Sequence, residues 1–192
     1  ETWSFNPQID IKYQVDLRSH SYTDSDVHVR GHLIPNASRN GNKTMQEQTF
    51  YVTNSVPQVH TNFNSGIWQT LEAAIQSKAK SQKLYIVTGV AFNKVGETKT
   101  IKYTTAKDDT KRVPIPNYFY KVVLLPTLNS AGAVTSAKCV GFWFENKAYS
   151  GSTYSTYSVS VDQIEEWTGF DFFPNLPDSV EGNAESSTTN FL

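Results

Sequence analysis

The strongest constraint in this sequence is a stretch of 41 residues, counted from His32 to Glu72, that carries a histidine, a neutral oxygen ligand and a carboxylate. His32 directly follows Gly31, and the neutral ligand is Asn64. Glycine lets the backbone bend, and histidine is the side chain best suited to take a proton near neutral pH. Amide and carboxylate oxygens hold hard cations such as Mg²⁺. Together these are the parts of a one-metal phosphodiesterase site, so the fold must bring them close to one another.

The spacing of Asn64 and Glu72 supports a shared site. Residues 65–80 are predicted to form a helix because Ile67, Leu71 and Ile75, with Ala74, make one apolar stripe. Eight residues is slightly more than two helical turns, so Glu72 would return to roughly the side of Asn64. Plainer explanations stay open at this point: Asn64 as a helix cap, Glu72 on a solvated helix face, and His32 as a structural or exposed histidine.

The rest of the chain predicts a mixture of helices and strands without a regular βαβ period, which indicates the α+β class. We expect a single domain over 1–178 and a loose polar tail over 179–192, where Ser, Thr, Asn and Glu dominate. Val161–Thr168 is expected to be a short helix ended by Gly169. The expected strands are 49–53, 84–87, 118–125 and 138–144.

Composition and charge narrow the class of protein. Hydrophobic residues make up 38% of 192 residues, which fits a folded globular protein, and no apolar run is long enough to cross a bilayer. The single cysteine, Cys139, is expected to be a buried thiol. Net charge is −1, but residues 78–112 are basic and residues 162–192 contain only acidic charges. These segments either line a phosphate-binding groove or are ordinary solvated loops.

The order of several short segments resembles the DNA/RNA non-specific endonuclease family, the ββα-metal or His-Me finger nucleases. The resemblance covers nearly the whole chain. Arg30-Gly31-His32 within 30–35 resembles the family's Asp-Arg-Gly-His signature, and 50–58 resembles its Asn-x-x-Pro-Gln strand, which contains Asn54. Residues 63–68 and Leu71-Glu72 resemble its metal-binding helix. Later segments that also resemble the family are 85–89, 113–122 and 161–174.

This resemblance implies a central, mostly antiparallel sheet flanked by helices, with a ββα-metal finger as the active site. It implies an endonuclease that acts on DNA and RNA, leaves 5′-phosphate ends and uses Mg²⁺, or Mn²⁺ or Ca²⁺ in its place. His32 would be the general base, Asn64 the direct metal ligand and Glu72 a carboxylate that orders the metal's water. Arg30 and Asn54 would orient the site or contact phosphate. It also implies a secreted, periplasmic or cell-surface bacterial protein and allows a homodimer.

Three departures from the family pattern bear on activity. Val29 stands where the family has Asp, and Gln76 stands where a basic residue is often found. An arginine that the family carries upstream would fall at about Glu1, so we expect the catalytic protein to extend further upstream. The alternative function is a catalytically impaired relative that binds nucleic acid or a surface partner.

Two further alternatives use other residues. Zinc could be held by histidines, since His28 and His32 are four residues apart and His20 and His60 are also available. The zinc hypothesis would make His32 a ligand rather than a base. The Ser/Thr/Tyr-rich segment 150–158 suggests an extracellular adhesin-like module.

Overall fold

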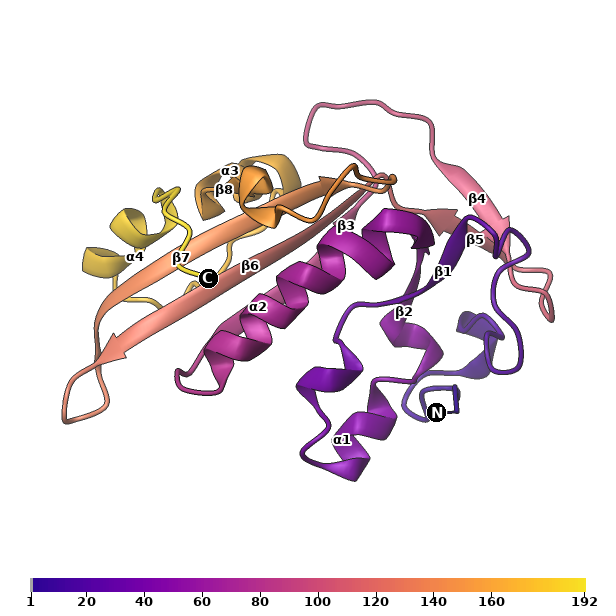
Figure 1. Cartoon of the computed structure of the whole chain (residues 1–192), viewed down its shortest axis with the longest axis horizontal. Coiled ribbons are helices and arrows are strands. Elements are labelled where there is room, and N and C mark those ends of the chain that lie inside the picture. The colour runs from indigo at the N-terminus through magenta and orange to yellow at the C-terminus, as the bar shows by residue number, and fades with distance from the viewer. Residues whose placement is uncertain (1) are drawn as a thin grey trace. The chain divides into compact units, whose positions relative to one another are not determined.

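The computed structural model describes residues 2–192 and contains helices and antiparallel strands, as the α+β class requires (Figure 1). Its contacts separate the chain into two compact units, each described here by itself. Unit 1 comprises the residues up to Glu72 together with Thr100–Asn117 and Asn146–Ser152. Unit 2 comprises Ala73–Lys99, Tyr118–Glu145 and Thr153–Leu192.

Unit 1 contains the two strands β1 and β2 and the first turn of the helix after them, which together carry the candidate site. Strand β1 (His28–His32) pairs antiparallel with β2 (Ser55–Val59), which places Gly31 opposite Val56. An irregular, kinked segment, η4 (His60–Trp68), follows β2 directly and leads into helix α2 (Gln69–Ala79). The remaining elements of unit 1 are η1 (Ile11–Tyr13), η2 (Asn36–Ser38), α1 (Lys43–Gln48), η3 (Val52–Asn54), and the antiparallel pair β4 (Lys102–Thr105) and β5 (Arg112–Ile115).

The strand expected over 49–53 is wrong. The amide groups of Thr49, Phe50 and Tyr51 donate to the carbonyls of Gln46, Glu47 and Gln48, so this segment turns back onto the end of α1. Those amides are therefore not available to a partner strand, apart from an isolated parallel bridge between Ser4 and Tyr51. Its apolar residues are nevertheless buried: Val52 packs with Leu17, Tyr22 and Ala106 in a core of unit 1.

The helix expected over 65–80 begins later than the apolar pattern predicts. Ser65 and Gly66 have non-helical backbone angles, and regular α-helix runs only over Gln69–Ala79. Asn62 takes a left-handed conformation with φ of 60°, which Asn tolerates better than most residues. The expected apolar stripe is confirmed at Ile67, Leu71 and Ile75, all of which are buried.

Unit 2 is built on an antiparallel sheet with strand order β3-β6-β7-β8. Two short helices, α3 (Val161–Thr168) and α4 (Asp178–Glu185), contact β7, as Figure 1 also shows. The strands predicted over 84–87, 118–125 and 138–144 are confirmed, although each is longer than predicted. Their bounds are β3 (Tyr85–Ala91), β6 (Tyr118–Leu128) and β7 (Val134–Glu145), and the sheet is completed by β8 (Ser158–Val159) next to η5 (Tyr154–Tyr157).

Helix α3 is confirmed at both ends. The Ser160 hydroxyl accepts a bond from the Gln163 N–H, and Gly169 ends the helix in the left-handed conformation. A side chain at Gly141 would collide with Ile164, because a Cβ there would lie 2.6 Å from Cδ1 of Ile164. Glycine on β7 therefore allows α3 to approach the sheet closely and bury Ile164.

The segment expected to be a loose tail from residue 179 differs from that expectation in its first half. Residues up to Glu185 continue α4, whose Val180 and Ala184 are buried. These two residues are four apart and share one helix face, which packs on β7. The polar composition of the segment concealed this small apolar face. Among residues 2–192, no helix combines the length and the apolar composition needed to cross a bilayer.

Candidate active site

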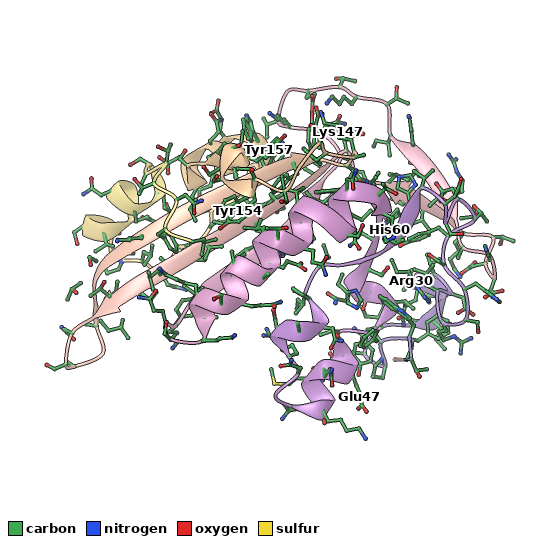
Figure 2. All side chains as sticks on the ribbon, viewed as in Figure 1. Arg30, Glu47, His60, Lys147, Tyr154 and Tyr157 are labelled. Carbon is green, nitrogen blue, oxygen red and sulfur yellow. The ribbon has the colours of Figure 1, made fainter. Side chains whose placement is uncertain are left out.

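Strand β1 fixes Arg30 and His32 against aromatic rings. The ring centroid of His32 lies 4.8 Å from that of Trp3 and 5.2 Å from that of Phe50, which meets it edge-on. The guanidinium of Arg30, labelled in Figure 2, lies 4.9 Å from the Trp3 ring, and its Nη1 donates to the Leu17 carbonyl at 2.7 Å. Burial lowers the pKa of Arg30 from its ordinary value. Both side chains are therefore held in fixed orientations on one side of the strand.

Asn54 holds the chain that follows His32. Its Oδ1 accepts from the Ile34 N–H at 3.0 Å, and its Nδ2 donates to the carbonyls of Ile34 and Thr49 at 2.9 Å each. The Asn54 carbonyl also accepts from the Leu33 N–H. The oxygen and the nitrogen of the Asn54 side chain both form hydrogen bonds with backbone groups. Asn54 therefore orients the end of β1, and its position supports this role over a direct contact with phosphate.

Asn64 is connected to β1 through Gln58. Nδ2 of Asn64 donates to Oε1 of Gln58 at 2.7 Å, and Gln58 is fully buried. A Cβ added at Gly31 would lie 2.4 Å from that same Oε1, so only glycine leaves room for the Gln58 side chain across β1. Asn64 is thereby positioned next to the backbone of the residue that precedes His32. Arg30 and His32 share a face with Trp3, whereas Gly31 faces Gln58.

Glu72 lies in the first turn of α2 and is half-buried. The argument that Asn64 and Glu72 share one continuous helix is wrong, because Ser65 and Gly66 interrupt the helix between them. Asn64 is instead positioned by its bond to Gln58.

Gln58 and Asn146 have structural roles at this site that the sequence analysis did not assign. Oδ1 of Asn146 accepts from the Val59 N–H at 2.8 Å, and its Nδ2 donates to the carbonyls of Pro57 and Pro116. A glutamine inside the apolar strand Ser55-Val56-Pro57-Gln58-Val59 was the available signal for Gln58. Asn146 had no comparable signal, because its partners lie far away in the chain.

Val29 departs from the family pattern at a position that the structure makes informative. In the β1–β2 ladder Val29 lies directly opposite Gln58. Among the described residues no acceptor reaches Nε2 of Gln58, although that atom is buried. Side chains directly opposite one another in an antiparallel pair are about 4.5–5.5 Å apart at Cβ, within reach of a hydrogen bond between longer side chains. An apolar residue at 29 cannot supply that acceptor.

The other histidines do not assemble a zinc site. Nδ1 of His28 bonds Asp24, Nδ1 of His20 bonds Asp108, and His60 is exposed where β2 ends (Figure 2). Within residues 2–192, the ligand atoms that gather in threes are those of an acidic group, and no histidine belongs to it. The zinc hypothesis therefore has no support in the described part of the chain.

Cys139 and two further residues, Trp68 and Lys121, are part of the interior. Cys139 is buried, and burial raises the pKa of its thiol to about 12, as expected of a core cysteine. Trp68 is buried, which indicates a packing role. Lys121 is also buried, and its Nζ donates to Thr88 Oγ1 at 2.9 Å. The arginine expected near Glu1 lies outside the described residues.

The donor set around Asn64 fits a hard divalent cation. Its amide nitrogen donates to Gln58, so that bond does not use the amide oxygen, which is the atom of an amide that binds cations. A neutral amide oxygen is a ligand that suits Mg²⁺, which prefers few protein oxygens and retains several waters. Gly31 preserves the space that this arrangement needs.

Comparison with known proteins finds several named nucleases. The chain is 29% identical to "Nuclease C1" of Cunninghamella echinulata var. echinulata over 189 residues, covering 96% of this chain and 71% of that protein. It is 30% identical to "Endonuclease G, mitochondrial" of Caenorhabditis elegans, covering 79% of this chain but 49% of the relative. A crystal structure of the EndoG/EndoGI complex matches 91% of this chain and 74% of its own with a TM-score of 0.66 at 22% identity, which shows a shared fold.

The family assignment rests on the sequence of almost the whole chain. Residues 1–179 match the family described as DNA/RNA non-specific endonuclease, whose members depend on a divalent metal. The expected antiparallel α+β architecture with a ββα-metal site agrees with the structural match. The chain therefore belongs to the DNA/RNA non-specific endonuclease family and is an endonuclease by that membership.

Proposed function

We propose that this chain hydrolyses phosphodiester bonds of both DNA and RNA, with a divalent cation held at Asn64. The bond from Nδ2 of Asn64 to the buried Gln58 carries the proposal, because it presents the amide oxygen as a ligand. When bound, Mg²⁺, or Mn²⁺ or Ca²⁺ in its place, would supply Lewis acidity at the phosphate and the departing 3′ oxygen. Glu72 would order the cation's water shell, and the products would carry 5′-phosphates.

His32 is proposed as the general base that takes a proton from the attacking water. Contacts with Trp3 and Phe50 support this role because they restrain the ring to one orientation. Arg30 has five N–H donors, and its bond to the Leu17 carbonyl uses one of them. Arg30 therefore orients β1 and retains donors for phosphate, while Asn54 acts by holding the loop after His32.

DNA and RNA are proposed as the partners because the family is described by both. The names of the relatives do not agree on one compartment, since one is called mitochondrial. A secreted, periplasmic or cell-surface location and a homodimer therefore stay predictions that follow from the resemblance alone.

The test is digestion of supercoiled plasmid and of single-stranded RNA with Mg²⁺, with EDTA, and with EDTA followed by excess Mg²⁺. We expect cleavage of both substrates, loss with EDTA and recovery with Mg²⁺, and fragments that ligase joins without added kinase treatment. Asn64→Ala should require much more Mg²⁺ for half-maximal rate. Asn40→Ala, which removes an exposed amide of the same unit, is the matched control. Equal metal dependence in the two variants would remove Asn64 as the ligand.

A second candidate is the catalytically impaired relative, favoured by one observation. The buried Nε2 of Gln58 has no acceptor among the described residues, and the residue opposite it is Val29. This deficit lies directly beside the atom that orients Asn64. Tight binding of plasmid without cleavage under every metal condition would establish this alternative in place of the enzyme.

A further inference from the structure

Three carboxylates of unit 2 converge between α3 and α4. Asp162 and Glu165 lie one turn apart on α3, and Glu185 is the last residue of α4. One oxygen from each lies within 4.8 Å of the others. Two oxygens bound to the same Ca²⁺ can be no further apart than twice the Ca–O distance of about 2.3–2.6 Å. The three oxygens are therefore close enough to share one ion.

Glu185 provides a second, independent observation. Only 4% of this residue is exposed, and its Oε1 is buried without any hydrogen-bond partner among the described residues. Buried carboxylates are normally paired, hydrogen-bonded or bound to a metal, because loss of hydration is costly. The other two members differ: Asp162 is exposed, and Oε1 of Glu165 accepts the Phe172 N–H at 2.7 Å. The group thus has a closed end at Glu185 and an open end at Asp162.

The charged groups that shift the pKa of Glu185 are acidic. Burial, and then the charges of Glu165, Glu181, Asp162 and Asp171, raise the pKa of Glu185 to about 8. Residues 162–192 contain neither lysine nor arginine, so this part of the sequence offers no cationic side chain to the group. A positive charge from solution would remove both the repulsion and the missing coordination at Glu185.

We propose that Asp162, Glu165 and Glu185 bind one Ca²⁺ that links α3 to α4. Ca²⁺ accepts six to eight oxygens in flexible geometry, so three carboxylates and several waters entering from the exposed side of Asp162 suit it. Mg²⁺ is less suitable because it demands near-ideal octahedral geometry and gives up its water reluctantly. The site is structural, lies within unit 2 and is independent of the proposed function of Asn64 and His32.

This ion would secure the C-terminal helix. Helix α4 has only eight residues, and its buried apolar side chains are Val180 and Ala184. Isolated helices of that length are marginal in water, so α4 depends on what its ends contact. Linking its last residue to α3 would hold both helices on β7. The competing occupant is a proton on Glu185, which would leave the carboxylates without a requirement for metal.

The test is calorimetric titration of the full chain with Ca²⁺ in an Asn64→Ala background, which removes the proposed catalytic ligand. We expect about one Ca²⁺ bound per chain, and a rise in Tm of about 5–10 °C at a hundredfold excess over the dissociation constant. Glu185→Gln and Asp162→Asn should each weaken binding at least tenfold. Glu166→Gln is the matched control, since this exposed residue of α3 bonds Gln163 and lies outside the group.

Each outcome decides the proposal. Absence of Ca²⁺ binding in the Asn64→Ala background, or unchanged binding after both Glu185→Gln and Asp162→Asn, would overturn it and leave a protonated Glu185. A larger rise in Tm with Mg²⁺ than with Ca²⁺ would also overturn the assignment of the ion. If Glu185→Gln does not fold, Asp162→Asn decides, because its exposed side chain makes no contribution to the core. Loss of nuclease activity in the parent chain leaves these results unaffected.

Discussion

Unit 1 ties its backbone together with side-chain amides, whereas unit 2 holds its longest strands by apolar burial. In unit 1, Gln14, Asn54 and Asn146 each bond backbone groups at both ends of the amide. In unit 2, β6 and β7 bring Val122, Leu124 and Cys139 against the buried residues of α3. Unit 1 has short strands with specific polar links, and unit 2 has long strands with a continuous core.

The pKa values of the carboxylates also differ between the two units. The pKa of Asp24 is lowered even though burial opposes this, because Thr104 and His28 donate to it. The pKa values of Glu165 and Glu185 are raised, first by burial and then by neighbouring acids. Unit 1 thus holds charges and dipoles at defined positions, which a catalytic site needs, and unit 2 provides stability. Changes in unit 1 should mainly affect turnover, and changes in unit 2 should mainly affect unfolding.

The largest expected effect of this division is on turnover after His32→Ala. Loss of a general base should lower the rate about 10²–10⁴-fold. His20→Ala, which removes an exposed histidine of unit 1, is the control and should retain turnover. Circular dichroism should show that both variants are folded. Wild-type turnover by His32→Ala would exclude this residue as the base.

Ile164→Ala should produce the opposite pattern in unit 2. This side chain is fully buried against Gly141, and removal of a buried isoleucine side chain to alanine costs about 2–5 kcal/mol of unfolding free energy. Turnover per folded molecule should stay unchanged at temperatures well below the transition. Urea unfolding and nuclease assays on the same preparation measure both quantities. A specific loss of turnover without loss of stability would break the comparison between the units.

Asn54→Ala should affect both properties, because it leaves the carbonyl of buried Thr49 without its side-chain donor and removes both bonds to the exposed Ile34 backbone. Such losses cost about 1–3 kcal/mol. Without the hydrogen bonds from Asn54, the end of β1 should position His32 poorly, so kcat should fall while KM changes little. Asn40→Ala controls for removal of an amide from an exposed position. If kcat is unchanged while stability falls, Asn54 supports the fold without orienting the site.

Val29→Asp should increase activity by up to about tenfold. The aspartate would accept a hydrogen bond from Nε2 of Gln58. Such a charged hydrogen bond is worth about 1.5–3 kcal/mol, from which the cost of burying the charge is subtracted. Val29→Asn supplies an acceptor without charge and should give a smaller gain. Initial rates and the Mg²⁺ concentration for half-maximal rate are the measurements. A decrease in both rate and metal affinity would mean that the surroundings of residue 29 are adapted to an apolar side chain.

The smallest expected effect is on stability at acidic pH. Burial opposes ionisation of Asp109, but the N–H groups of Asp16 and Lys111 and the Lys111 ammonium lower its pKa from 3.8 to about 2. A lowered folded-state pKa contributes stability above pH 3.8 that is lost as the pH falls towards 2. With solvent screening this amounts to about 1 kcal/mol or less. Tm measured between pH 5 and 2 should fall less steeply in Asp109→Asn.

Elements whose residues carry the whole signal were predictable from the sequence. β6 and β7 follow from long apolar runs, and α3 follows from a Ser160 cap and a terminal Gly169. The segment over 49–53 was not predictable in this way. Its composition is typical of a strand, but its backbone N–H groups donate to carbonyls of α1. Helix α4 was not evident from the sequence, because two small apolar residues are enough to pack a helix on a sheet.

The candidate site shows the same limit. Residue types and order suggested candidate chemical groups, but they did not predict the geometry that positions Asn64. The expected continuous helix is interrupted, and the connection to β1 runs through Gln58. Amide side chains bond backbone groups of any residue, so their type does not identify the partner. The bond from Asn146 to the Pro57 carbonyl spans 89 residues of sequence.

That bond has a consequence for how copies of the protein behave in concentrated solution. The His60 N–H donates to the Val27 carbonyl, and the Leu33 N–H donates to the Asn54 carbonyl. The backbone N–H and C=O groups at even-numbered positions of β2 therefore face β1, and those at odd-numbered positions face away from β1. Asn146 bonds the outward groups at Val59 and Pro57, and proline has no N–H to offer. A two-stranded ribbon would otherwise present an open edge to a strand of another molecule. By bonding these outward groups, the Asn146 side chain occupies backbone positions that a strand of another molecule would otherwise use.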